Sequence, residues 1–221
     1  MIKADHKRWA RFVFSLYITG QLKKHFAHFY ILNEVPEDNP SASVILCPNH
    51  FSWWDGFLID FICRKFFPGK LFHIMMLEDQ LKRYWFFQKL GAYSINPDNP
   101  RSIVSTINYT HLLTKKENSF IAIYPQGEYQ PVDAAKITLR EGLRKFIGTA
   151  PRGVRVIPIA FNFRHTDEKL PSVYCRFGTP LHPADIEKDF TLFESAFREN
   201  ISLLLSESGS VKPAKDLFTN G

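Results

Sequence analysis

The sequence predicts a single α/β domain with a mostly parallel, twisted β-sheet flanked by helices. Its 221 residues are enough for one domain with a full hydrophobic core. Hydrophobic residues make up 45% of the chain, which excludes an intrinsically disordered protein. Short apolar runs of strand length alternate with segments of helical periodicity, a pattern typical of βα units. We find no internal repeat and no linker that would divide two domains.

The N-terminal segment precedes this alternating pattern. Residues 7–30 are basic and aromatic, and their apolar side chains recur at helical spacing with an interruption at Gly20. This arrangement predicts a pair of short amphipathic helices. We therefore divide the chain into membrane-associating N-terminal helices (1–32), an α/β domain (33–209) and a frayed tail (210–221).

Six apolar runs in the α/β region have the length and composition of buried strands, and helical segments separate the first five of them. A capping box of Thr191 and Glu194 predicts the start of the last helix, and Gly209 ends it. The predicted strands are 43–47, 71–77, 92–95, 120–124, 154–163 and 173–177. The other predicted helices are 53–67, 80–90, 102–115 and about 138–147.

The chain is basic and rich in aromatic residues. It has 28 Lys and Arg against 22 Asp and Glu, with 21 Phe, 8 Tyr and 4 Trp. Its basic residues lie among bulky apolar side chains and no nucleic-acid-binding motif occurs, so we expect a membrane lipid surface and no nucleic acid as partner. The rings expected to contact that surface lie beside Lys and Arg in the N-terminal segment: Trp9, Phe12 and Phe26.

The cysteines and the uncharged stretches bear on cofactors and location. Cys47, Cys63 and Cys175 lie far apart, which fits a reducing compartment and predicts no metal or other cofactor.

The longest uncharged stretch, 39–54, includes Pro48 and cannot span a membrane as a helix. No cleavage site follows the basic N-terminal segment. We expect a peripheral protein on the cytoplasmic face of a membrane, neither secreted nor membrane-spanning.

Two loops that follow predicted strands carry the candidate chemistry, because ligands of parallel sheets bind at the carboxyl ends of strands. In the first, His50 ends a strand and Asp55 lies in the opening turn of the next helix. Asp55 would accept a hydrogen bond from one imidazole nitrogen and leave the other as a base. The alternative is that both are ordinary loop and helix-start residues. The same spacing recurs in two pairs that we interpret as structural: His73 with Glu78, and His182 with Glu187.

The larger pattern around these loops favours the catalytic interpretation. Asn49-His50-Phe51-Ser52-x-x-Asp55 resembles the first sequence block of the glycerolipid acyltransferase superfamily, to which lysophosphatidate acyltransferases belong. Four further segments resemble later blocks in the same order, and the likeness covers roughly residues 30–182. These segments are 91–95, 124–127, 156–159 and 177–180.

The resemblance implies roles for individual residues. His50 would be the general base that takes the proton of an acceptor hydroxyl, while Asp55 would orient and stabilise its imidazole. The hydroxyl would attack the thioester of acyl-CoA or acyl carrier protein directly, so Ser52 is expected to cap the loop rather than act as a nucleophile. The turn at Pro125, Gln126 and Gly127 would hold the acyl oxyanion and the donor, although Gly127 also fits a simple turn glycine.

The sequence departs from the family pattern where the acceptor phosphate is expected to bind. The second block usually ends in Arg, where this chain has Pro97, with Arg101 four residues later. The third block usually reads Glu-Gly-Thr-Arg, where this chain places Glu128 and Tyr129 after the glycine. The candidate acceptor-binding residues are Arg101, Glu128, Lys136 and Arg140, and the alternative for the basic ones is a solvated helix face.

The sequence therefore predicts an O-acyltransferase that moves a fatty acyl group to a lysophosphatidate-type glycerolipid. The altered blocks leave two alternatives open. One is the same chemistry on a lipid alcohol or glycolipid without a phosphate. The other is a membrane-surface lipid-binding module that has kept the fold and lost the activity.

Overall fold

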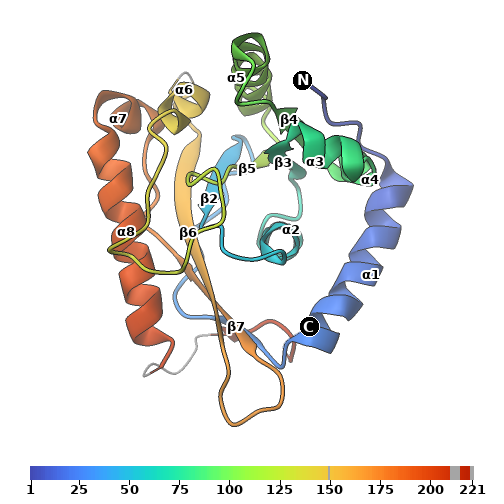
Figure 1. Cartoon of the computed structure of the whole chain (residues 1–221), viewed down its shortest axis with the longest axis vertical. Coiled ribbons are helices and arrows are strands. Elements are labelled where there is room, and N and C mark those ends of the chain that lie inside the picture. The colour runs from blue at the N-terminus through green and yellow to red at the C-terminus, as the bar shows by residue number, and fades with distance from the viewer. Residues whose placement is uncertain (149, 210–214, 220–221) are drawn as a thin grey trace.

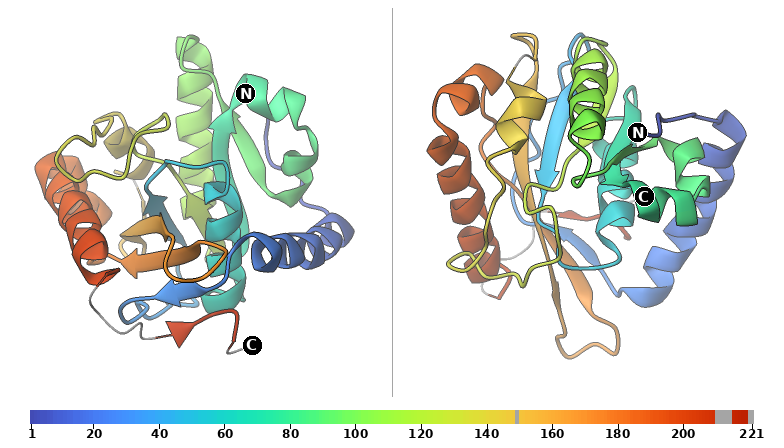
Figure 2. Two further views of the ribbon diagram at one scale, coloured as in Figure 1. Left: turned by 60° about the horizontal axis from the view of Figure 1, so that its bottom comes forward. Right: turned by 45° about the horizontal axis from the view of Figure 1, so that its top comes forward.

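A computed structural model describes residues 1–148, 150–209 and 215–219, which form one α/β domain around an eight-stranded sheet (Figures 1 and 2). The strand order is β4-β3-β5-β2-β6-β7-β1-β8. The β6–β7 and β1–β8 pairs are antiparallel and the other pairs are parallel, so the predicted fold class is confirmed. The strands are β1 (Phe29–Ile31), β2 (Val44–Pro48), β3 (Leu71–Leu77), β4 (Ala92–Ile95), β5 (Ser119–Ala122), β6 (Arg155–Arg164), β7 (Ser172–Phe177) and β8 (Lys215–Asp216).

Helices cover both faces of the sheet and divide the core in two (Figure 1). Strand β2 shows why, since Val44 and Leu46 pack with residues of α1 and α2, while Ile45 and Cys47 pack with residues of α5, α6 and α8. A central parallel strand buried on both faces needs such an uninterrupted apolar sequence. The helices are α1 (Arg8–His25), α2 (Asp55–Phe66), α3 (Glu78–Arg83), α4 (Phe86–Leu90), α5 (Pro100–Thr114), α6 (Leu143–Ile147), α7 (Pro183–Lys188) and α8 (Phe190–Glu207).

The N-terminal segment differs from the predicted helical pair. It forms the single helix α1, which continues through Gly20 because a glycine inside a helix costs only about 1 kcal/mol. The residues that follow do not continue as a helix, since β1 at 29–31 pairs with β7 inside the sheet. Phe26 is buried in the core, so its expected place at a membrane interface is wrong, whereas Trp9 and Phe12 are exposed.

The C-terminal segment, expected to be a frayed tail, adds a strand to the sheet. Lys215 and Asp216 form β8, which pairs with β1. His28 reinforces this pairing, because its imidazole hydrogen-bonds to the Asp216 carboxylate at 2.7 Å. Leu217, directly after β8, is buried in the core, whereas 210–214 and 220–221 of the predicted tail lie outside the described residues.

Several helices also differ from the predicted ones. The segment 80–90 forms two short helices, α3 and α4, and α6 is shorter than predicted. The short helix α7 was not predicted. The last helix has Asp189 as its N-cap rather than Thr191, and the Asp189 carboxylate accepts hydrogen bonds from the Thr191 backbone N–H and hydroxyl at 2.9 and 2.6 Å. Both residue types are good N-caps, so the sequence could not choose between them.

The sheet order explains where a site can form. Strand β5 lies between β2 and β3, and all three run parallel. The loops that follow these strands therefore leave the sheet at one edge and lie close together, which is where parallel sheets bind ligands. The loop after β2 carries His50, and the segment after β5 carries residues 124–130.

Candidate active site

Asn49 fixes the point where the chain leaves β2. Its buried amide bonds to both backbone groups of Phe161 on β6: the side-chain N–H₂ donates to the Phe161 carbonyl at 2.9 Å, and the side-chain oxygen accepts from the Phe161 N–H at 2.7 Å. The amide thus continues the hydrogen bonding of the sheet after the strand ends. The next residue, His50, begins its loop from a rigid position.

His50 and Asp55 form a hydrogen-bonded pair. The His50 Nδ1–H donates to Asp55 Oδ2 at 2.9 Å, and the same oxygen accepts from the backbone N–H groups of Phe51 and Ser52 at 2.7 and 2.9 Å. Asp55 is fully buried at the start of α2, and burial raises the pKa of its carboxyl group although these three hydrogen bonds oppose the shift. With Nδ1 engaged by the carboxylate, Nε2 of His50 is free to accept a proton.

The segment after β5 holds the backbone of His50. The buried side chain of Gln126 accepts from the His50 N–H and donates to the His50 carbonyl, the latter at 3.3 Å. The Gln130 N–H donates to that same carbonyl at 2.9 Å. Neither glutamine was expected to serve this purpose, and their types carry no signal for it in the sequence. His50 is thus attached to two strand-end loops at once.

Two tyrosine rings pack against the imidazole of His50. The ring centroids of Tyr124 and Tyr129 lie 4.2 and 4.1 Å from that of His50, with interplanar angles of 30° and 33°. Two near-parallel rings at this distance cannot share one face of a five-membered ring, so the tyrosines flank the imidazole. Sequence reasoning missed this arrangement, because it noted Tyr129 only as a departure from the family pattern.

The turn after Tyr124 depends on Gly127 and Arg140. Gly127 has a φ of +72°, and a Cβ there would lie 2.5 Å from Nε of Arg140. Arg140 packs over this turn, since its Nε donates to the Gln126 carbonyl at 3.2 Å and its guanidinium pairs with the Glu128 carboxylate at 3.8 Å. The Gly127 N–H already donates to the Tyr124 carbonyl at 3.3 Å, so it can serve an acyl oxyanion only by sharing that bond.

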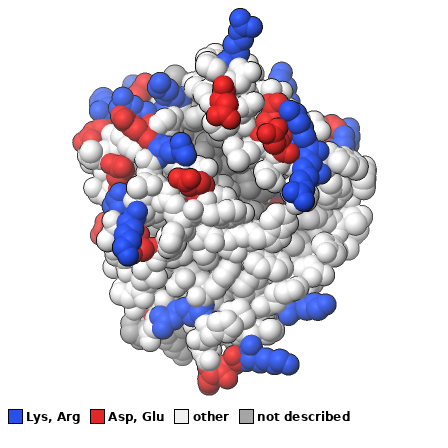
Figure 3. All heavy atoms as spheres, in the orientation of Figure 1, with Lys and Arg blue, Asp and Glu red and all other residues white. Residues whose placement is uncertain are grey.

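His50 opens onto a cavity of about 600 Å³, within the usual range of small-molecule sites. Most of its wall is apolar and comes from α2, β3 and α4, including Phe57, Phe72, Ile74, Phe87 and Leu90. Four of its lining side chains are charged or carry an amide: Asp60, Gln80, Arg83 and Glu128. Figure 3 shows a hollow in the upper part of the face seen in Figure 1, with Lys, Arg, Asp and Glu atoms around it.

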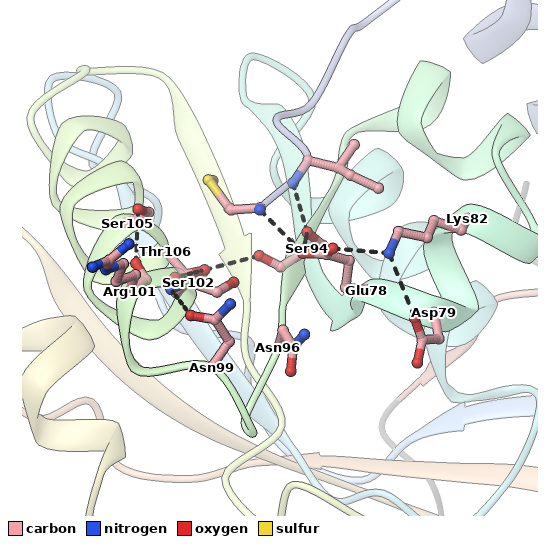
Figure 4. Close-up of polar contacts among 12 residues, drawn as sticks. Glu78, Asp79, Lys82, Ser94, Asn96, Asn99, Arg101, Ser102, Ser105 and Thr106 are labelled. Atoms are coloured by element: carbon pink, nitrogen blue, oxygen red, sulfur yellow. Dashed lines mark hydrogen bonds and ion pairs between the residues drawn. The ribbon is translucent and has the colours of Figure 1, made fainter.

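The predicted site residues fall into two groups. His50, Asp55, Pro125, Gln126, Gly127, Glu128 and Arg140 come together at this strand edge. Lys136 is exposed and pairs with Asp133 at 3.4 Å, and it does not line the cavity. Arg101 lies on the first turn of α5 with its side chain turned away from Ser94 (Figure 4).

The second block serves the packing of β4 in this structure. The Ser94 carbonyl accepts from the buried Thr106 hydroxyl at 2.9 Å, which joins β4 to α5, and the Ser94 hydroxyl donates to Glu78 of α3 at 3.4 Å (Figure 4). These contacts hold three neighbouring elements together. Arg83, at the end of that same α3 helix, is the one Lys or Arg that the described residues contribute to the cavity wall. The sequence blocks gave no reason to select it.

Comparison with known proteins identifies the family and the fold of this chain. A sequence model of the acyltransferase family matches residues 27–162, more than half of the chain. The chain belongs to the acyltransferase family. This acyltransferase is similar to the crystal structure of the 1-acyl-sn-glycerophosphate (LPA) acyltransferase PlsC from Thermotoga maritima, with a TM-score of 0.59 and 16% sequence identity over 90% of this chain and 79% of that chain. No curated protein sequence matches it.

These findings confirm the predicted glycerolipid acyltransferase superfamily, and the structural match concerns the fold. The matched range contains the His50–Asp55 pair, the 124–130 segment and most of β6. Within the described residues of this acyltransferase, none of the helices has the length and hydropathy of a membrane span.

Proposed function

We propose that this acyltransferase moves a fatty acyl group from a thioester, acyl-CoA or acyl carrier protein, to a hydroxyl of a lysophosphatidate-type glycerolipid, with His50 as the general base. The observation that carries the proposal is the His50–Asp55 pair, which forms a hydrogen bond of 2.9 Å and lies beside a largely apolar cavity. Such a cavity suits an acyl chain, because burial of each methylene group gains about 0.8 kcal/mol.

The reaction follows from the position of the free imidazole nitrogen. Nε2 of His50 takes the proton of the acceptor hydroxyl while that oxygen attacks the thioester carbonyl. The new C–O bond forms, the C–S bond breaks, and the imidazolium returns its proton to the departing thiolate. Asp55, anchored by two backbone N–H groups, stabilises the imidazolium between these steps. Ser52 is not needed as a nucleophile, and its hydroxyl accepts a hydrogen bond from the Trp54 N–H at 3.2 Å.

Two charged groups on the cavity wall bear on the acceptor. Arg83 lines the cavity and packs against the ring of Tyr84, so its charge is available to an acceptor phosphate. Glu128, which would repel a phosphate, is partly neutralised by Arg140 at 3.8 Å. These features favour a phosphorylated acceptor over the uncharged lipid alcohol or glycolipid that the altered sequence blocks also allow.

The decisive experiment offers the purified protein acyl-CoA or acyl carrier protein with a panel of phosphorylated and unphosphorylated acceptors and follows the products by mass spectrometry. His50→Ala should lower kcat by about 10²- to 10⁴-fold, the usual loss of a general base. His73→Phe is the matched control, because His73 is buried away from the cavity wall and should leave kcat unchanged. Transfer that survives His50→Ala would contradict the mechanism. Saturable lipid binding without transfer to any acceptor would instead favour the non-catalytic lipid-binding module.

A membrane surface is the proposed location, on its cytoplasmic face, and the outer side of α1 supports it. Five large apolar side chains there are 56–66% exposed and recur at helical spacing: Trp9, Phe12, Val13, Leu16 and Tyr17. Figure 3 shows the face over α1 as a wide area with few charges, continuous with the hollow. An exposed apolar stripe of this kind suits the headgroup boundary of a bilayer.

Vesicle sedimentation tests this surface. A variant with Phe12, Leu16 and Tyr17 changed to Ser should bind anionic vesicles at least about tenfold more weakly, since it removes apolar area from the contact. The matched control changes three exposed apolar residues of other helices, Val104, Leu112 and Leu192, to Ser. The assignment of α1 would be contradicted if both variants lost vesicle binding equally, or if neither variant lost it.

A further inference from the structure

The structure assigns Tyr129 a role in the transfer step: we propose that its ring positions the imidazole of His50 and stabilises the positive charge that the imidazole gains. This inference rests on the proposed function of His50 as general base. It concerns a residue that stands where the family's third block usually has Arg, so it describes a property of this chain rather than a shared motif.

The position of the Tyr129 ring is fixed by its contact with the imidazole and by the hydrogen bonds of the residue that follows it. Tyr129 packs on one face of the imidazole at 4.1 Å while Tyr124 covers the other at 4.2 Å. The residue after Tyr129, Gln130, donates its N–H to the His50 carbonyl at 2.9 Å. The Gln130 side chain bonds to Thr138, with its oxygen accepting from the Thr138 N–H at 2.8 Å. These bonds hold Tyr129 over His50, and its own hydroxyl makes no hydrogen bond to another described residue.

The two tyrosines differ in a way that makes Tyr129 the one to test. Tyr124 is half-buried and packs against the core, and its buried hydroxyl has no hydrogen-bond partner among the described residues, so replacing it would open a hole in the site. Tyr129 is 58% exposed and lines the cavity, so its ring can be replaced at little cost to folding. Its ring thus packs against His50 while much of the side chain remains exposed to solvent.

The chemistry of the step gives the ring its effect. The imidazole is neutral before the transfer and positive once it has taken the acceptor proton. The faces of a tyrosine ring carry negative electrostatic potential and attract a cation lying over them. The ring therefore stabilises the transition state more than the resting state, and such a difference appears in kcat rather than in KM. An Arg at this position would instead place a second positive charge beside the imidazolium.

The experiment compares Tyr129→Leu, which keeps apolar bulk and removes the ring, with Tyr129→Phe, which keeps the ring and removes the hydroxyl. We expect Tyr129→Leu to lower kcat by about five- to thirtyfold, the range of a cation–π contact, with KM for donor and acceptor within about twofold of wild type. Tyr129→Phe is expected to recover most of the wild-type kcat. Equal kcat in wild type and Tyr129→Leu, or equal losses in the two variants, would overturn the inference.

A second readout does not depend on activity. Diethyl pyrocarbonate modifies accessible imidazole nitrogens, and the modification of His50 can be followed by peptide mass spectrometry. We expect His50 to react several times faster in Tyr129→Leu than in wild type or Tyr129→Phe, provided that the variants melt at similar temperatures. Equal rates in all three proteins would overturn the ring contact itself. Protection by the ring in a protein without transferase activity would instead refute the proposed function alone.

Discussion

Two His–carboxylate pairs with the same sequence spacing end up in opposite situations in this protein. His50 lies in the loop after β2 and Asp55 at the start of α2, and the two form a hydrogen bond of 2.9 Å. His73 and Glu78 have the same separation in sequence, but His73 is buried in β3 with no hydrogen-bond partner for either ring nitrogen among the described residues. Glu78 instead pairs with Lys82 at 3.0 Å.

The backbone between the members of each pair explains the difference. Residues 73–77 are extended in β3, and five residues of strand separate the two side chains by about 16 Å. The chain between His50 and Asp55 turns back on itself, because the backbone N–H groups of Phe51 and Ser52 both donate to the Asp55 carboxylate. A loop that leaves a buried strand therefore makes the pair, and the spacing alone does not.

Among the substitutions that test this comparison, the largest effect is expected from replacing the carboxylate of the His50–Asp55 pair. Asp55→Asn should lower kcat by about a hundredfold, because the amide cannot stabilise the imidazolium as a carboxylate does. Burial raises the pKa of Asp55, so its ionisation lowers the stability of the folded state as the pH rises through that pKa. The variant should therefore unfold in urea at neutral pH at a concentration no lower than wild type. A variant that loses activity and stability together would show that Asp55 acts mainly as a structural residue.

The next largest effect concerns His73, the histidine of the pair that does not form. Burial lowers the pKa of His73 to about 3, and nearby His6 and Arg11 add to the shift. The pKa of His73 is lower in the folded than in the unfolded protein. The contribution of its neutral imidazole to the free energy of unfolding is therefore complete above pH 6.5 and is lost as the pH falls toward 3. Wild type should lose about 2 kcal/mol between pH 7 and pH 5 through this group, and His73→Phe should not. Urea titrations at both pH values measure the difference, and parallel losses in the two proteins would contradict it.

A third prediction concerns the turn that holds His50. Gly127→Ala should lower the free energy of unfolding by about 1–2 kcal/mol, because its φ of +72° is unfavourable for alanine and the added Cβ meets Arg140. Gly142→Ala is the matched control, since Gly142 has a φ of −53° and nothing within 4 Å of an added Cβ. The control should be neutral or slightly stabilising in thermal unfolding. Equal effects at both glycines would show that the turn tolerates a side chain.

The smallest expected effect tests the direct-transfer mechanism at the first pair. Ser52→Ala should change kcat by less than about threefold and stability by about 1 kcal/mol or less, because its hydroxyl only accepts one hydrogen bond from the Trp54 N–H. Steady-state kinetics and thermal unfolding measure the two quantities. A loss of activity as large as that of His50→Ala would indicate a covalent acyl-serine intermediate.

The strands and the His50–Asp55 pair were predictable because their signals are local. Strands 71–77 and 92–95 were predicted with the bounds that the structure shows, since each is a short apolar run bounded by charged or turn-forming residues. The placement of His50 and Asp55 could be inferred because a strand, a loop and a helix start follow one another directly. The helix boundaries were less accurate, because several residue types can begin a helix equally well.

The residues around the His50–Asp55 pair could not be predicted in the same way. Tyr129 reaches His50 across 79 positions of the sequence, and Gln126 and Gln130 bond to its backbone from that same segment. Lys136 matched the expected charge for an acceptor site, yet it lies off the cavity, whereas Arg83 lies on the wall. Each outcome depends on which distant segments the sheet brings together.

The sequence by itself determined the α/β class, the family and the His50–Asp55 pair, because apolar periodicity and strand-end loops act over a few residues. Only the tertiary structure decided that residues 29–31 and 215–216 join the sheet and that two tyrosines enclose the imidazole. The physical reason is that hydrogen bonds between strands and contacts between rings are made by segments far apart in sequence. Their free energies exceed the local preferences of short polar or aromatic segments, which would otherwise favour helix, loop or frayed chain.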